Sequence, residues 1–159
     1  MIDISQYYVF LIPIAIGTLI HAIKFILYLL RHDYNWKLAI EHGLTYGHMP
    51  SSHTGFAISL ITSVGHYEGI STGAFAVAVA LAIFIIDDAI RLRIQMGHQA
   101  RYMNIMTQKL ELDPKEFPRL KERVGHKKIE VLVGGILGLL FTLALIRLLE
   151  IYPLPIITF

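Results

Sequence analysis

The stretch Tyr7–Leu30 reads YYVFLIPIAIGTLIHAIKFILYLL and carries a single charged residue, Lys24. It is longer than the roughly 20 apolar residues that a helix needs to cross a bilayer. Two later stretches, Gly73–Ile86 and Val131–Ile146, contain no charged residue, and with a few flanking residues both reach the same length. The three stretches predict membrane-spanning helices.

The composition of the whole chain supports this interpretation. Only 16% of its 159 residues are charged and 55% are hydrophobic, whereas an ordinary soluble domain has about 25% charged residues. Buried core helices of a soluble protein are the alternative, which three such stretches in one short chain disfavour. A net charge of +2 gives no indication of nucleic-acid binding, and the absence of cysteine excludes disulfides and thiolate chemistry. We predict a single integral membrane domain over residues 1–159.

A fourth stretch, Thr54–Ile70, is less apolar, and as a helix of 17 residues it would be about 25 Å long, a marginal span. Two polar blocks, Arg31–Ser52 and Arg91–Lys128, hold twelve of the fourteen Lys and Arg residues. If Thr54–Ile70 spans the membrane, both blocks lie on the same side, and the positive-inside rule makes that side cytoplasmic. We therefore expect an all-α bundle of about four transmembrane helices, with a cytoplasmic helical connector that begins as a continuation of the third helix.

Polar residues that could bind a ligand or take part in catalysis stand at the start of the stretch Thr54–Ile70, where Gly47–Thr54 reads GHMPSSHT. Proline and serine before an apolar run are typical of a helix N-terminus, which Ser51 or Ser52 would cap. Such an end binds anions, because unpaired N–H groups and the helix dipole point the same way. His53 would then face the bound anion, although the same pattern is compatible with a cap that has no function.

Two further pairs of residues stand at helical spacings. His126 and Glu130 are four apart, so on a helix the carboxylate could hold one imidazole nitrogen and select the tautomer; a surface ion pair is the alternative. Lys24 and Arg31 are seven apart and share a helix face. A lysine inside a membrane span costs roughly 2.5–3.5 kcal/mol and indicates function. Snorkelling to the interface explains Lys24 poorly, because it lies well inside the apolar stretch.

Together these motifs resemble the type 2 phosphatidic acid phosphatase superfamily, which includes vanadium haloperoxidases. Its motifs are Lys-x6-Arg-Pro, Pro-Ser-Gly-His and Ser-Arg-x5-His-x3-Asp. The chain is more similar to a divergent, short membrane branch. That similarity runs over Gly47–Thr54, over Asp88–Asn104 and over Leu120–Val131.

The resemblance implies a role for each matching residue. His126 would be the nucleophile that takes the phosphoryl group, Glu130 would orient it, and His53 would protonate the leaving group. Phosphate ligands would be Lys24, Arg31, Ser51, Ser52 and Arg93, with support from Asp88, Gln99, Asn104 and Lys121. The resemblance implies no metal and no cofactor.

Several positions depart from the superfamily pattern. Residue 32 is His where Pro is expected, Ser52 replaces Gly and Glu130 replaces Asp. The Ser-Arg ahead of the nucleophile is absent, because position 120 is Leu; Arg93, or one of the nearby residues Arg119, Lys121 and Arg123, would have to serve instead.

The resemblance therefore implies a metal-independent membrane phosphatase. It would act on a lipid phosphate at the cytoplasmic face, with membrane lipids as its other partners. Polyprenyl phosphates, phosphatidic acid and phosphatidylglycerophosphate remain open as substrates. A non-catalytic lipid-phosphate binding or transport protein is the main alternative, and a structural subunit is a third. A homo-oligomer is compatible with so small a bundle.

Overall fold

The computed structural model describes residues 4–32, 34, 36, 49–122 and 124–153, and in these ranges the chain is helical with no strand. The elements are a 3-10 turn η1 (Ile4–Tyr7), α1 (Tyr8–Arg31), α3 (Ser52–Tyr67), α4 (Gly73–Asp87), a π-helical segment η3 (Asp88–Leu92), α5 (Arg93–Lys109) and α6 (Lys128–Ile151). The predicted all-α membrane fold is confirmed. Most of the polar block 31–52, including Gly47 and His48, lies outside the described residues.

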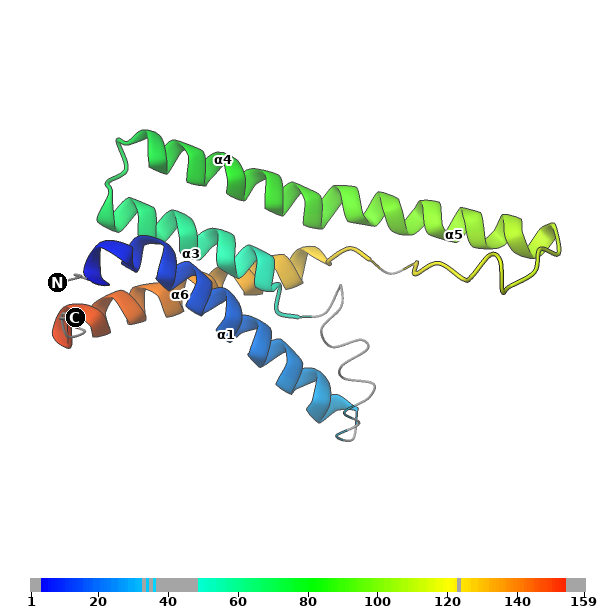
Figure 1. Cartoon of the computed structure of the whole chain (residues 1–159), viewed down its shortest axis with the longest axis horizontal. Helices are drawn as coiled ribbons and strands as arrows, with labels where there is room; N and C mark the ends of the chain where they lie inside the picture. The colour runs from blue at the N-terminus through cyan, green and yellow to red at the C-terminus, as the bar shows by residue number, and fades with distance from the viewer. Residues whose placement is uncertain (1–3, 33, 35, 37–48, 123, 154–159) are drawn as a thin grey trace.

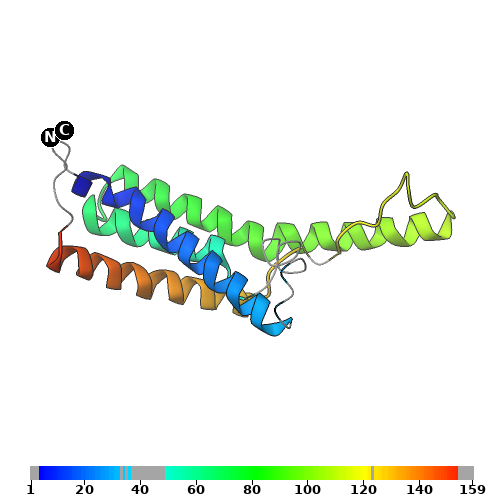
Figure 2. The same ribbon diagram turned by 60° about the horizontal axis from the view of Figure 1, so that its bottom comes forward.

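Helices α1, α3, α4 and α6 form a bundle, and α3 contacts each of the other three (Figure 1). The segments α4, η3 and α5 make one continuous rod, and the α5 part projects beyond the bundle (Figure 2). The connector that follows α5 runs back beside it toward α6. The predicted continuation of the third helix is therefore present.

Within the described residues, three segments are long and apolar enough to cross a membrane: Ser5–Arg31, Gly73–Lys109 and Lys128–Ile151. Helix α3 has 16 residues, hence about 24 Å, which is less than the roughly 30 Å of a hydrocarbon core. Helix α3 begins two residues before the start of the predicted stretch Thr54–Ile70 and ends three residues before the end of that stretch. It ends ahead of Gly69, whose φ of +93° is incompatible with a continuing helix. It nevertheless runs the length of the bundle, since the Tyr67 ring contacts Tyr8 at the far end.

The bundle is held by two kinds of packing. Helix α1 presents a buried stripe of every fourth residue to α6: Tyr8, Ile12, Ile16 and Ile20. Helices α3 and α6 instead meet backbone to backbone, because a Cβ added at Gly138 would collide with the Gly55 carbonyl, and one at Gly134 with the Ser51 carbonyl. Small residues four apart allow such close approach between membrane helices. This contact sets the N-terminus of α3 against the N-terminus of α6.

Candidate active site

The N-terminus of α3 forms one wall of the site. Ser51 is the N-cap, and its fully buried Oγ accepts a hydrogen bond from the Thr54 N–H at 3.4 Å. The Ser51 N–H donates to the Glu130 carbonyl oxygen at 3.1 Å, which ties this cap to α6. Pro50 precedes the cap and does not lie in the first turn, whereas His53 does.

His126 and Glu130 meet, but the expectation that they share a helix face is wrong. Helix α6 begins at Lys128, so His126 lies two residues before it. Contact arises because the Glu130 carboxylate turns back over the helix end, where one oxygen lies 3.1 Å from His126 Nδ1 and accepts the Lys127 N–H at 3.0 Å. A carboxylate only accepts, so Nδ1 donates its proton and the lone pair is on Nε2.

His126 is also held through its backbone. Its N–H donates to the Ala89 carbonyl oxygen in η3 at 3.1 Å. The side chains of His126 and Glu130 are only 5% and 9% exposed, so both are fixed by packing as well as by hydrogen bonds. The imidazole therefore has one defined orientation.

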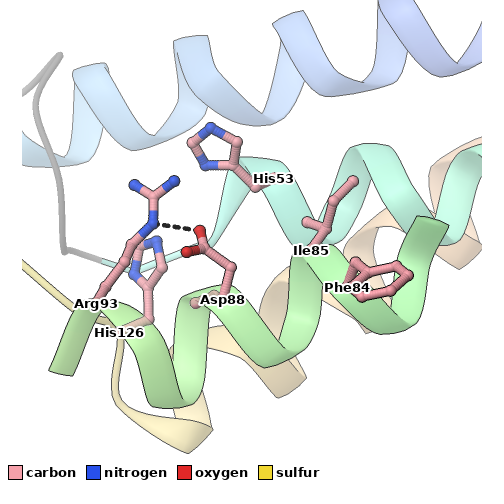
Figure 3. A pocket seen from close by; sticks show the side chains of 7 residues that line it. His53, Phe84, Ile85, Asp88, Arg93 and His126 are labelled. Atoms are coloured by element: carbon pink, nitrogen blue, oxygen red, sulfur yellow. Dashed lines mark hydrogen bonds and ion pairs between the residues drawn. The ribbon is translucent and has the colours of Figure 1, made fainter. Parts of the chain in front are cut away.

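A cavity of about 210 Å³ lies between these elements and is lined by His53, Phe84, Ile85, Asp88, Ala89, Arg93 and His126. Figure 3 shows the Arg93 guanidinium, the Asp88 carboxylate and the His126 ring close together, with the His53 ring reaching toward them from α3. Arg93 Nε donates to Asp88 Oδ2 at 2.6 Å. These two residues are five apart, and the π turn, in which the Arg93 N–H bonds the Asp88 carbonyl, brings them to the same side.

The charged groups at the cavity are Arg93 and Lys24, which are positive, and Asp88 and Glu130, which are negative. Lys24 is buried in α1, with 4% exposure. Burial lowers the pKa of His126, the positive charges of Lys24 and Arg93 lower it further, and the hydrogen bond to Glu130 opposes them. His126 is consequently neutral at physiological pH, the form in which an imidazole can act as a nucleophile.

Other predicted site residues lie at varying distances from this cavity. Ser52 is half-buried, with its Oγ 3.4 Å from His21 Nδ1. Arg31 is exposed at the end of α1, Gln99 is exposed on α5, and Lys121 is exposed on the connector; none of the three lines the cavity. Arg119 is exposed and pairs with Glu122, and Arg123 lies outside the described residues.

Asn104 has a structural contact of its own. Its Nδ2 donates to the Leu120 carbonyl oxygen at 2.9 Å and to Glu122 Oε1 at 3.0 Å, and its Oδ1 accepts the Leu120 N–H at 2.9 Å. Asn104 thereby clamps the connector that leads to His126 against α5, outside the cavity itself.

An apolar groove of about 370 Å³ adjoins the cavity. It is lined by Ile14, Gly17, Thr18, His21, Ser52, His53, Phe56 and Ile85. His53 and Ile85 belong to both spaces. Sequence reasoning missed the groove and the lining residues Phe84 and Ile85, whereas Ala89 lies within the stretch Asp88–Asn104 on which the resemblance rests. Apolar residues that line a cavity look the same in a sequence as those that face lipid.

Comparison with known proteins identifies the family of this chain. The family model described as the divergent PAP2 family matches residues 5–141. An uncharacterized membrane protein of Bacillus subtilis (strain 168), YuiD, is 33% identical over 123 residues, which cover 70% of this chain and 75% of that protein. No solved structure matches the chain. The matched region includes both histidines, Glu130 and the cavity between them, and the chain belongs to the divergent PAP2 family.

Proposed function

We propose that the protein is a metal-independent membrane phosphatase that hydrolyses a phosphate monoester or diphosphate on a lipid through a phosphohistidine intermediate. One observation carries the proposal: His126 and His53 face a single cavity from separate elements, with His126 Nδ1 held by Glu130. An oriented nucleophile and a proton donor on opposite sides of one phosphate are what the reaction requires.

In the first step, His126 Nε2 attacks phosphorus and the bond to the leaving oxygen breaks. Protonated His53 gives its proton to that oxygen, and the alcohol, or phosphate monoester in the case of a diphosphate, departs. In the second step, water attacks the phosphohistidine and neutral His53 takes a proton from it. The P–N bond breaks, inorganic phosphate leaves and His126 regains its lone pair.

The phosphoryl oxygens need positive partners during both steps. Arg93 lines the cavity, Lys24 is buried close enough to affect His126, and the N–H groups at the start of α3 add the positive end of a helix dipole. Ligand roles for these groups are part of the proposal. The role of Arg31 rests on the family resemblance alone.

The groove beside the cavity supports a lipid as substrate. Its walls are mostly apolar, and His53 stands where groove and cavity join. An acyl or prenyl chain in the groove would place the phosphate attached to it at the two histidines.

A non-catalytic lipid-phosphate binding or transport protein is the second candidate. It is favoured by Leu120 in place of the expected serine and by the engagement of Arg93 with Asp88 at 2.6 Å. An arginine tied to a carboxylate neutralises less phosphoryl charge in the transition state.

The deciding experiment measures phosphate release by the purified protein. Polyprenyl phosphate, phosphatidic acid and phosphatidylglycerophosphate are supplied in mixed micelles, with His126→Ala as the control. Release that His126→Ala abolishes and vanadate inhibits supports the phosphatase. Lipid-phosphate binding without any release would establish the second candidate.

The lipid part of the proposal has its own test. Thr18→Trp fills the groove, whereas Leu19→Trp adds the same side chain at the next, exposed position, which does not line it. Thr18→Trp should raise KM for lipid phosphates and leave the hydrolysis of a small soluble phosphate unchanged. Equal effects of the two variants would remove the groove from the substrate site.

The active site is proposed to face the cytoplasm, because ten of the fourteen Lys and Arg residues lie in the block 91–128. Cysteine introduced at Lys115, on the exposed connector, should react with an impermeant maleimide only in opened cells. Cysteine at Ile70, 75% exposed at the opposite end of the bundle, should react in intact cells. The reverse pattern would invert the orientation.

A further inference from the structure

Helix α5, together with Leu92 at the end of η3 and Leu110 just after α5, carries an apolar stripe along the side that faces away from the connector. Leu92, Met96, Gln99, Met103, Met106 and Leu110 follow one another at alternating spacings of four and three residues. Apart from Gln99 each is apolar, and each of these five is at least half exposed. Alternating spacings of this kind place residues on one narrow seam, the a and d positions of a coiled coil.

The opposite side of α5 is already covered. Gly97 lies so close to the connector that a Cβ there would collide with the Glu122 carbonyl, and Asn104 bonds to Leu120 and Glu122. The connector therefore covers the Gly97–Asn104 face of α5. The stripe is the broad apolar face of α5 that remains uncovered. Because α4, η3 and α5 are one rod, α5 extends beyond the bundle as a projecting arm (Figure 2).

We propose that the stripe binds the same stripe of a second copy, so that the protein is a parallel homodimer paired through its α5 arms. Apolar residues that repeat at alternating spacings of four and three can pack against an identical set of residues on a second helix. Two copies inserted in one membrane in the same orientation hold their arms parallel, which is the arrangement that brings each stripe residue to its own counterpart.

The charges along the seam permit this pairing. The positions that flank the stripe are Arg93, Gln95, Ala100, Tyr102, Thr107 and Lys109. The four central ones are uncharged, and the two cations stand at the ends of α5, where Arg93 pairs with Asp88. Helix α5 has no acidic residue, and its central cation, Arg101, projects toward the connector side with Asn104 and Glu122. Two stripes can therefore meet along their central part without opposed like charges. Gln99, in the middle of the seam, would pair with Gln99 of the second copy and set the register.

The stripe is shorter than the three to four heptads that define a coiled coil by sequence alone. Anchoring compensates for this shortness. Each arm is fixed at one end by its membrane helix, so the two stripes meet at a high effective concentration once the bundles are neighbours. This dimer does not depend on catalysis, and a protein without phosphatase activity would still form it.

Single cysteines test the proposal in full-length protein in native membranes, since the chain has no cysteine of its own. Met103→Cys and Met106→Cys should form intermolecular disulfides under mild oxidation. Gln108→Cys, on the connector side of the same helix beside Asn104, should form several times less. Equal cross-linking at all three positions, or none at any, would overturn the proposal.

A second measurement uses the mass of the purified protein in detergent. The unmodified protein should have twice the 18.0 kDa chain mass, and Met103→Glu combined with Met106→Glu should reduce it to a single chain. The control Gln108→Glu should leave the dimer intact. A monomer in the unmodified protein that also fails to cross-link would exclude a second copy as the occupant.

Discussion

The helix bundle and the projecting arm, which consists of α5 and the connector beside it, differ in how far their polar groups are exposed to solvent. In the bundle, Glu130 is buried and its carboxylate is enclosed by the His126 ring and the Lys127 N–H. In the arm, Glu122 meets Asn104 and the exposed Arg119 at the surface. A buried carboxylate has no water to replace a lost partner, whereas an exposed one does. The bundle should therefore be sensitive to changes that the arm tolerates.

The largest effect is expected from the loss of the Glu130 carboxylate. Glu130→Gln keeps the shape but loses the charge that holds the His126 tautomer, and we expect phosphate release to fall by about 10³- to 10⁴-fold, as in triads that lose their carboxylate. Glu122→Gln, the matched change in the arm, should leave the rate nearly unchanged. Equal losses in the two variants would show that the site extends into the connector.

His53→Ala comes next. Loss of a general acid costs typically 10²- to 10⁴-fold, and we expect that loss for an alkyl phosphate measured by kcat. For nitrophenyl phosphate, whose leaving group needs no proton, the loss should be much smaller. If the loss of kcat is the same for both substrates, His53 binds phosphate and does not protonate the leaving group.

The backbone contact between α3 and α6 gives a test of stability. Gly134→Ala places a methyl group against the Ser51 carbonyl and should lower the free energy of unfolding by about 1–3 kcal/mol. Gly135→Ala is the matched control, since a Cβ there has only ordinary contacts, 3.6 Å from Ile58 and Thr54. Thermal unfolding in detergent measures both. A stable Gly134→Ala variant would mean that the helices can separate at the site without cost.

The pKa of His126 predicts the acid limb of the pH profile. Protonation removes the lone pair of Nε2, so kcat/KM should fall about tenfold per pH unit below that pKa, which burial holds below the ordinary 6.5. The hydrogen bond to Glu130 raises the pKa of His126, so the residual activity of Glu130→Gln should have its acid limb at lower pH. An acid limb that moves upward in this variant would contradict the assignment of the limb to His126.

The smallest effect is expected in the arm. Asn104→Ala removes two hydrogen bonds to the Leu120 backbone at an exposed position. We expect hydrogen exchange of the connector to rise about fivefold, the equivalent of about 1 kcal/mol, with little change in global unfolding. A large loss of activity would make the clamp part of the path that positions His126.

Local information was enough for the elements of this fold. The apolar runs in α1, α4 and α6 predict long helices, because backbone groups inside a membrane must be satisfied within the helix. The serine cap before α3 is equally local, since Ser51 bonds a group three residues away. The pairing of His126 with Glu130 was also predicted, although for the wrong reason: the carboxylate reaches a residue outside the helix.

Other features depended on contacts between segments far apart in the chain. The residues that share the cavity with the histidines, Phe84 and Ile85, are indistinguishable in sequence from lipid-facing neighbours, and only the position of α4 beside α3 selects them. The Arg93 side chain reaches the cavity because the π turn before it places Arg93 on the same side of the helix as Asp88. Arg31 does not, because α1 ends away from it.

By itself, the sequence determined the helices, the membrane class and the family, since these depend on apolar runs, caps and motif spacings within short stretches. Only the tertiary structure decided which motif residues share a cavity, that a groove joins it, and that one face of α5 is covered while the other is free. The physical reason is that these properties depend on the relative placement of whole helices. That placement follows from the fit of small residues such as Gly134 and Gly138 against a distant backbone.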